Sequence, residues 1–175
     1  MNQNKLVSVI VNCHNGQKYL EGCIESALNQ TYKNWELIFW DNASTDESRK
    51  ILYKFKDSRI KYFKSEIFTS LYEARNLAIA KAKGDYVGFL DTDDLWIEDK
   101  IEKQISFLEK NKDFKIVYSN YWILKEAKKI EIKKFKFNLP SGNITQNLLD
   151  YYPLGILTVL MEREIFNKFK FNKTY

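Results

Sequence analysis

Polar side chains that could bind a ligand gather at three places in this sequence, each directly after a short apolar run. The three groups are Asn12 with His14, Asp41 with Asn42, and the acidic stretch Asp91, Thr92, Asp93 and Asp94. The apolar runs are typical of buried strands. Ligands of open parallel sheets bind beyond the carboxyl ends of the strands, so the sequence predicts one shared site.

The acidic stretch could hold a hard divalent cation. Asp91 and Asp93 are separated by one residue, and Mg²⁺ or Mn²⁺ needs only one or two protein carboxylates when phosphate oxygens supply other ligands. The pair therefore favours a cation bound to a diphosphate. Taken alone, the same spacing is more often a helix cap formed by Asp93 or Asp94. The polar groups after the other two apolar runs favour the metal site instead.

The elements that must position these residues alternate along the chain. Strands are expected at residues 7–11, 35–40, 60–63 and 86–90, and helices at residues 17–30, 44–55, 70–83 and 97–108. The S-x-x-E signatures at Ser44 and Ser70 predict capped helix starts. This order predicts an α/β fold in which a mostly parallel sheet carries helices on both faces.

The regular alternation ends near residue 110. Residues 111–175 contain a lysine-rich segment, a short helix expected near 144–151, and an apolar segment at 155–161. Because no Gly/Ser linker separates 1–110 from 111–175, we expect two halves of one domain.

Length and composition exclude several classes of protein. A chain of 175 residues with 45% hydrophobic residues is expected to fold as one domain. Two cysteines, Cys13 and Cys23, cannot supply a disulfide framework, which favours a cytoplasmic protein.

The net charge of +5 comes mostly from Lys125 to Lys136, where six Lys and two Glu leave a surplus of +4. We expect a solvated lysine-rich surface rather than a nucleic-acid site, because Arg is scarce.

Five segments carry a specific family resemblance. They are residues 7–20 (VSVIVNCHNGQKYL), 26–32 (SALNQTY), 40–46 (WDNASTD), 73–79 (EARNLAI) and 84–96 (GDYVGFLDTDDLW). In order and spacing they resemble the family 2 inverting nucleotide-sugar glycosyltransferases, which have the GT-A fold and many of which build bacterial surface polysaccharides. The resemblance implies sugar transfer from a nucleoside-diphosphate sugar to an acceptor hydroxyl with inversion, supported by Mn²⁺ or Mg²⁺. It also implies a glycan or lipid-linked acceptor.

The resemblance assigns the first two polar groups to the nucleotide. Asn12 and His14 would line the nucleotide pocket, and Asp41 and Asn42 would face the base. The family more often has a second Asp at the position of Asn42, where a carboxylate accepts a hydrogen bond from the uracil imide. An amide can also accept that bond, so a UDP-sugar is favoured. The structural alternatives are that Asn12 and His14 satisfy loop backbone groups and that Asp41 forms a turn with Ser44.

The resemblance assigns the acidic stretch to the diphosphate. Asp93 would be the direct metal ligand, Asp91 would reach the ribose or the metal shell, and Thr92 would lie in the nucleotide-sugar site. Arg75 would lie near the nucleotide or the acidic stretch; the alternative is an exposed helix residue.

The general base is the missing part of this pattern. In the family it is an acidic residue after a segment like 165–175, whereas Glu162 and Glu164 precede that segment and are expected on a solvated helix surface. The resemblance therefore implies a donor half at 1–110, the start of an acceptor-side half at 111–175, and a general base beyond Tyr175.

Three other functions stay open. One is a nucleotide-sugar binding fragment without catalysis. A second is a sugar-phosphate nucleotidyltransferase, which needs a glycine-rich basic loop that residues 12–20 lack. The third is peripheral contact with the inner face of a cell membrane through Lys125 to Lys136, which is compatible with catalysis.

Overall fold

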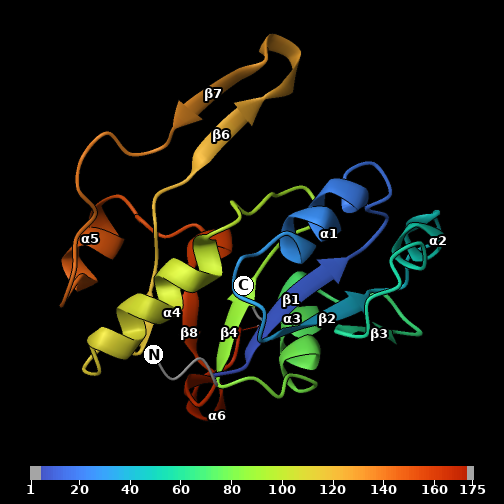
Figure 1. Ribbon diagram of the computed structural model, residues 1–175, viewed down its shortest axis with the longest axis horizontal. Coiled ribbons are helices and arrows are strands. Elements are labelled where there is room, and N and C mark those ends of the chain that lie inside the picture. Colours follow the sequence, from blue (N-terminus) through green and yellow to red (C-terminus); the bar gives the residue numbers. More distant parts are fainter. Residues whose placement is uncertain (1–4, 173–175) are drawn as a thin grey trace.

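The computed structural model describes residues 5–172 and shows a mixed α/β fold around one six-stranded sheet (Figure 1). The sheet order is β3-β2-β1-β4-β8-β5. Its strands are β1 (Val7–Cys13), β2 (Trp35–Asp41), β3 (Ile60–Lys64), β4 (Tyr86–Phe89), β5 (Ile116–Val117) and β8 (Leu160–Glu162). The first four are parallel, and β8 runs antiparallel between β4 and β5. The predicted fold class is confirmed.

Helices cover both faces of this sheet. They are α1 (Leu20–Leu28), α2 (Ser48–Leu52), α3 (Leu71–Ile79), α4 (Lys100–Lys110) and α6 (Ile165–Lys168). A further helix, α5 (Thr145–Asp150), buries no residue, and two short 3₁₀ turns are η1 (Glu126–Lys128) and η2 (Ile156–Thr158). Alternate residues of β1 point to opposite faces. Val9 packs in the core that α1 and α4 cover, and Ile10 packs in the core that α3 and α6 cover. Because both faces of the sheet are buried, the sequences of its central strands are nearly continuous apolar runs.

The register of β1 and β2 explains why their polar ends meet. The two strands pair in step from Val7 opposite Trp35 to Cys13 opposite Asp41. They consequently end at the same level of the sheet, and their following loops start side by side.

One of the two capping predictions is wrong. Ser70 caps α3 as expected, since its side chain accepts a hydrogen bond from the backbone N–H of Glu73. Ser44 does not cap α2, which begins at Ser48 without a side-chain cap. The backbone N–H of Ser44 donates instead to the Asp41 carboxylate at 2.8 Å, so the chain makes a turn here before it can start a helix.

A second, two-stranded sheet projects from the body (orange at the top of Figure 1). It is the hairpin of β6 (Trp122–Lys125) and β7 (Ile130–Lys133), and every residue of both strands is exposed. The lysine-rich segment is thus solvated, as predicted. The short helix expected near 144–151 is present as α5.

Within residues 5–172, no helix is both long enough and apolar enough to cross a membrane.

Candidate functional site

The loops that follow β1 and β2 are joined by backbone and side-chain hydrogen bonds. The N–H of Asn42 donates to the carbonyl of Cys13 at 2.7 Å, and the His14 Nδ1 lies 2.9 Å from the carbonyl of Asn42. Asn12 is buried at the end of β1, and its side-chain Nδ2 has no hydrogen-bond partner among the described residues. A buried amide donor without a partner is costly, which marks this edge as a place for a polar ligand.

Asp41 is buried and accepts hydrogen bonds from within the protein. Its side chain is 1% exposed. One carboxylate oxygen accepts from the N–H of Ser44 and the other accepts from the Tyr62 hydroxyl, both at 2.8 Å. Burial, followed by this bond to Asp41, raises the pKa of Tyr62. The structure therefore shows the turn with Ser44 that the sequence left open, and Asp41 braces β2 against β3.

Asn42 is committed to the loop that precedes α3. Its amide N–H donates to the carbonyl of Thr69 at 2.8 Å, and its carbonyl oxygen accepts from the N–H and hydroxyl of Thr69. This clamp brings Phe68 beside the site. The Phe68 ring is 62% exposed and its centroid lies 4.4 Å from that of His14. Sequence reasoning missed Phe68, because an aromatic residue outside any periodic element carries no local signal.

The acidic stretch is held by α3. The Arg75 side chain is buried, and its Nη2 donates to both carboxylate oxygens of Asp91 at 3.0 and 2.9 Å. The guanidinium also lies 6.0 Å from the ring centroid of Phe89 and 5.7 Å from that of Phe171. Arg75 thus lies against the acidic stretch, and the alternative of an exposed helix residue is wrong.

A glycine allows the acidic stretch to touch the loop after β1. A Cβ atom on Gly16 would lie 3.0 Å from both the Thr92 hydroxyl oxygen and the Cys13 Sγ. The Cys23 thiol in α1 donates weakly to the carbonyl of Asp91 at 3.6 Å. The loops after β1, β2 and β4 therefore form one connected edge.

The remaining carboxylates of the acidic stretch, Asp93 and Asp94, have no ion pair with a basic side chain in the part of the chain that the structure describes. Asp93 is exposed and has no hydrogen bond or ion pair among residues 5–172. Burial, and then the negative charges of Asp93 and Asp91, raise the pKa of Asp94 to about 6. Neither Asp93 nor Asp94 caps α4, whose N-cap is Asp99. Oxygen donors with unneutralised charge fit a hard divalent cation.

This acidic stretch cannot enclose a metal ion by itself. In the described part of the chain, no group of three or more His, Cys, Asp or Glu side chains could hold one. With at most two carboxylates from the described residues, oxygens of a bound phosphate group or of water would complete the coordination.

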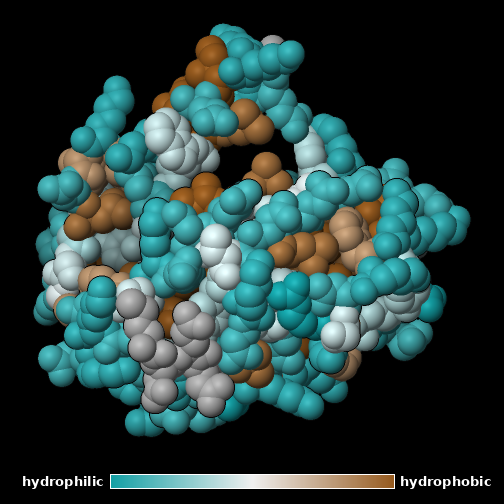
Figure 2. Space-filling view, viewed as in Figure 1, coloured by the Kyte–Doolittle hydropathy of each residue, from teal (hydrophilic) through white to brown (hydrophobic). Residues whose placement is uncertain are grey.

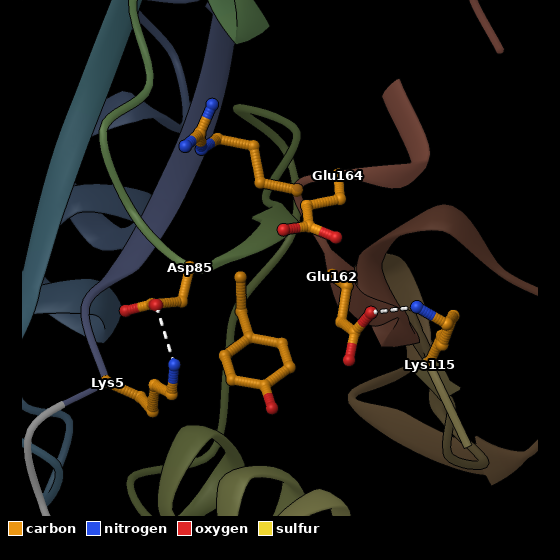
Figure 3. A pocket seen from close by; sticks show the side chains of 7 residues that line it. Lys5, Asp85, Lys115, Glu162 and Glu164 are labelled. Carbon is orange, nitrogen blue, oxygen red and sulfur yellow. Dashed lines mark hydrogen bonds and ion pairs between the residues drawn. The ribbon is translucent and has the colours of Figure 1, made fainter. Parts of the chain in front are cut away.

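A hollow of about 260 Å³ lies at the opposite edge of the sheet (Figure 3). Its lining includes Glu164 and two exposed ion pairs, Lys5 with Asp85 and Lys115 with Glu162, each at 2.8 Å. The predicted helix position of Glu162 is wrong: it lies in β8, opposite the first residue of β4. Glu162 and Glu164 therefore lie at the edge away from the acidic stretch.

The comparison with protein families covers nearly the whole chain. The model of glycosyl transferase family 2 matches residues 8–165. The UDP-Glc:alpha-D-GlcNAc-diphosphoundecaprenol beta-1,3-glucosyltransferase WfgD of Escherichia coli is 38% identical over 166 residues, which are 95% of this chain and 64% of that protein. The putative teichuronic acid biosynthesis glycosyltransferase TuaG of Bacillus subtilis is 36% identical over 166 residues, 93% of this chain and 64% of that protein. The chain thus spans less than two thirds of the length of these relatives.

Solved structures support the same fold. TarS 1-349 of S. aureus aligns with a TM-score of 0.79 over 96% of this chain and 50% of that chain, at 20% identity. The mannosyltransferase PcManGT of Pyrobaculum calidifontis, solved with GDP-Man and Mn²⁺, aligns with a TM-score of 0.68 over 93% of this chain and 46% of that chain, at 19% identity. Together with the connected edge formed by the loops after β1, β2 and β4, the match over residues 8–165 shows that this chain belongs to glycosyl transferase family 2.

Proposed function

We propose that this chain binds a nucleoside-diphosphate sugar, with a UDP-sugar favoured, at the carboxyl edge of β1, β2 and β4. The single observation that carries the proposal is the contact between the Gly16 loop and Thr92, which sets the unpaired Asn12 amide and the acidic stretch on one edge. Relatives named for UDP-Glc and a TarS structure with UDP at 26% identity support this donor class.

The geometry suggests how the base would be held. The exposed rings of His14 and Phe68 form an aromatic corner on which a pyrimidine could stack. Because the Asn42 amide is occupied by Thr69, we infer that Asn42 positions the Phe68 loop instead of reading the base. Its replacement of the family's more common Asp therefore does not argue against uracil.

The acidic stretch would hold a Mn²⁺ or Mg²⁺ ion, with Asp93 as the direct ligand and Asp91 in the metal shell. When bound, such an ion neutralises the negative charge that develops on the leaving diphosphate. Asp91 is kept in place by Arg75, so its carboxylate is oriented before a ligand arrives. Thr92 would add a hydroxyl beside the diphosphate.

The reaction we propose is transfer of the sugar with inversion to an acceptor hydroxyl, which attacks the anomeric carbon as the diphosphate leaves. Relatives from E. coli are named for an acceptor linked to diphosphoundecaprenol, and we propose a lipid-linked acceptor here. Since Glu162 and Glu164 lie at the other edge of the sheet, we place the general base outside residues 5–172.

Differential scanning fluorimetry with UDP, GDP, CDP and dTDP, each with and without Mn²⁺, tests the donor class. A ligand that binds only the folded state raises its stability. We expect UDP with Mn²⁺ to raise Tm most, and Mn²⁺ alone to have little effect because the protein offers too few ligands.

The Asp93→Asn variant tests the metal ligand by calorimetry. We expect at least about a tenfold loss of UDP affinity in Mn²⁺ and no change without metal. Asp113→Asn, at an exposed aspartate away from the site, should bind as the unchanged chain does. Equal UDP affinity of the Asp93→Asn and unchanged chains in Mn²⁺ would refute the metal assignment.

A second candidate is a donor-binding unit without transfer activity. The observation that favours it is the position of Glu162 and Glu164 at the far edge. Incubation of the 175-residue chain with UDP-glucose, Mn²⁺ and a lipid-linked acceptor tests this candidate and the placement of the base together, and we expect no transfer. Transfer by this chain would show that its general base lies within these residues.

A further inference from the structure

The β6–β7 hairpin exposes apolar and basic side chains on both of its faces. Residues directly opposite each other in an antiparallel pair share a face. One face carries the pairs Trp122 with Lys133 and Leu124 with Glu131, and the other carries Ile123 with Ile132 and Lys125 with Ile130. Trp122 is 59% exposed and Leu124 is 53% exposed. Neither face is therefore a solvent-facing polar surface of the usual kind.

Hydrogen bonds join the two flanks of the hairpin at its base. The Asn120 side chain accepts from the N–H of Phe135 and donates to its carbonyl at 3.2 and 2.7 Å, while the N–H of Lys134 donates to the carbonyl of Tyr121 at 2.9 Å. A two-stranded ribbon without a covered face is only marginally stable in water. The exposed hairpin should therefore become more stable when an apolar medium covers one of its faces.

The charge of this segment indicates what that medium is. Lys125 to Lys136 carries six Lys, two Glu and no Arg. Lysines interleaved with aliphatic side chains and a Trp are typical of elements that lie in the interface of an anionic bilayer. Figure 2 shows hydrophobic and hydrophilic side chains interleaved on the hairpin at the top of the view, above a hollow that separates it from the body. We propose that the β6–β7 hairpin docks this protein on an anionic lipid surface, with its apolar side chains in the interface and its lysines at the headgroups.

The tip of the hairpin reaches the loop before α1, so docking would orient the candidate site. The Glu126 carboxylate accepts from the Tyr19 hydroxyl at 3.3 Å and lies 3.8 Å from the Lys18 Nζ. That loop follows β1 and contains Gly16, which touches Thr92. A bilayer under the hairpin would therefore lie on the side of the carboxyl edge, where a lipid-linked acceptor would arrive. This consequence rests on the proposed function, whereas lipid docking itself does not.

Sedimentation with vesicles tests the docking. The 175-residue chain is mixed with phosphatidylcholine vesicles that contain or lack phosphatidylglycerol, at low and high salt. We expect binding only to the anionic vesicles and weaker binding at high salt. The apolar variant is Trp122→Ser with Leu124→Ser. The charge variant replaces four hairpin lysines by Gln: Lys125, Lys128, Lys129 and Lys133.

A matched control keeps the same net charge as the charge variant. It replaces four exposed lysines away from the hairpin by Gln: Lys56, Lys110, Lys112 and Lys170. Because the attraction of four lysines to the anionic surface is removed, we expect the charge variant to lose on the order of 100-fold in partitioning. The apolar variant should lose at least about tenfold, since each buried methylene adds to membrane affinity. The control should lose much less, and circular dichroism should show that all variants are folded.

Two results would overturn the proposal. One is equal vesicle binding by the control and the hairpin variants. The other is absence of binding to the anionic vesicles; if self-association that the apolar variant abolishes accompanies it, the hairpin is an interface between copies. UDP calorimetry on the same samples separates the two proposals, since loss of nucleotide binding with intact vesicle binding would refute only the proposed function.

Discussion

At the scale of single residues, two buried basic side chains differ in their partners. Arg75 orients Asp91 from α3, and Lys100 is the buried first residue of α4. The Lys100 Nζ donates to Gln104 at 2.7 Å and sits 4.0 Å from the Trp96 ring centroid, without a carboxylate partner. One of these charges is paired and the other is not, so they should respond differently to substitution.

Replacing Arg75 by Met should destabilise the fold by about 2 kcal/mol, because the partly buried Asp91 carboxylate loses its charged partner. Urea denaturation measures this change. Lys103→Met, which breaks an exposed pair with Asp99, should cost no more than about 0.5 kcal/mol. If both variants lose the same stability, the Arg75–Asp91 pair does not brace the acidic stretch.

Lys100 should make stability depend on pH. Burial lowers its pKa to about 7, whereas an unfolded lysine titrates near about 10.4. Between these values the unfolded chain binds more protons, so stability rises with pH, with a slope of up to about 1.4 kcal/mol per unit. We expect Lys100→Met to remove this rise in urea titrations from pH 7 to 10 and the exposed Lys110→Met to keep it. An unchanged slope in Lys100→Met would contradict the prediction.

At the scale of elements, a buried polar network aligns the strands that carry the site. The Glu36 carboxylate of β2 accepts from the Ser8 hydroxyl of β1 and from the N–H of Lys83, both at 2.7 Å. The Ser8 hydroxyl in turn accepts from the N–H of Gly84 at 2.8 Å. These bonds fix the turn before β4 against β1 and β2. The level at which β4 ends, and hence the position of the acidic stretch, depends on this turn.

Gly84→Ala should therefore be costly. A Cβ there would lie 2.6 Å from the backbone nitrogen of Ser8 and 2.8 Å from the carbonyl oxygen of Leu6, so the backbone must shift. We expect a loss of roughly 2–3 kcal/mol in urea denaturation. Gly22→Ala in α1 is the control, because its Cβ would meet only Leu95 at an ordinary 3.4 Å. This variant should raise the free energy of unfolding by about 0.5–1 kcal/mol. Similar stabilities of the two variants would show that the turn is not constrained.

At the scale of the whole molecule, the second half completes the sheet of the first. The β8 strand pairs with β4 and carries Leu160 into the core, and Phe166 of α6 packs in the other core. The Trp96 indole also donates to the carbonyl of Leu157 at 2.9 Å. The proposed donor half at 1–110 therefore shares its sheet and its core with residues of 111–175.

A chain ending at residue 110 should not fold stably. It would expose the edge of β4, which invites aggregation, and would leave the Trp96 indole without its partner. Near-UV circular dichroism and size-exclusion chromatography check this, with the 175-residue chain as the reference. A monomeric 1–110 chain with cooperative melting near the Tm of the full chain would contradict the prediction.

The sequence by itself determined the order of strands and helices, the Ser70 cap and the family, because apolar periodicity, capping and motif spacing are local patterns. Only the tertiary structure decided which way the polar side chains point. Asp41 turns inward to Ser44 and Tyr62, Asn42 clamps Thr69, and Phe68 lies beside His14. It also decided that β8 enters the sheet between β4 and β5. A hydrogen-bonding side chain takes the partner that the fold brings within reach, and those partners come from segments whose proximity no local pattern encodes.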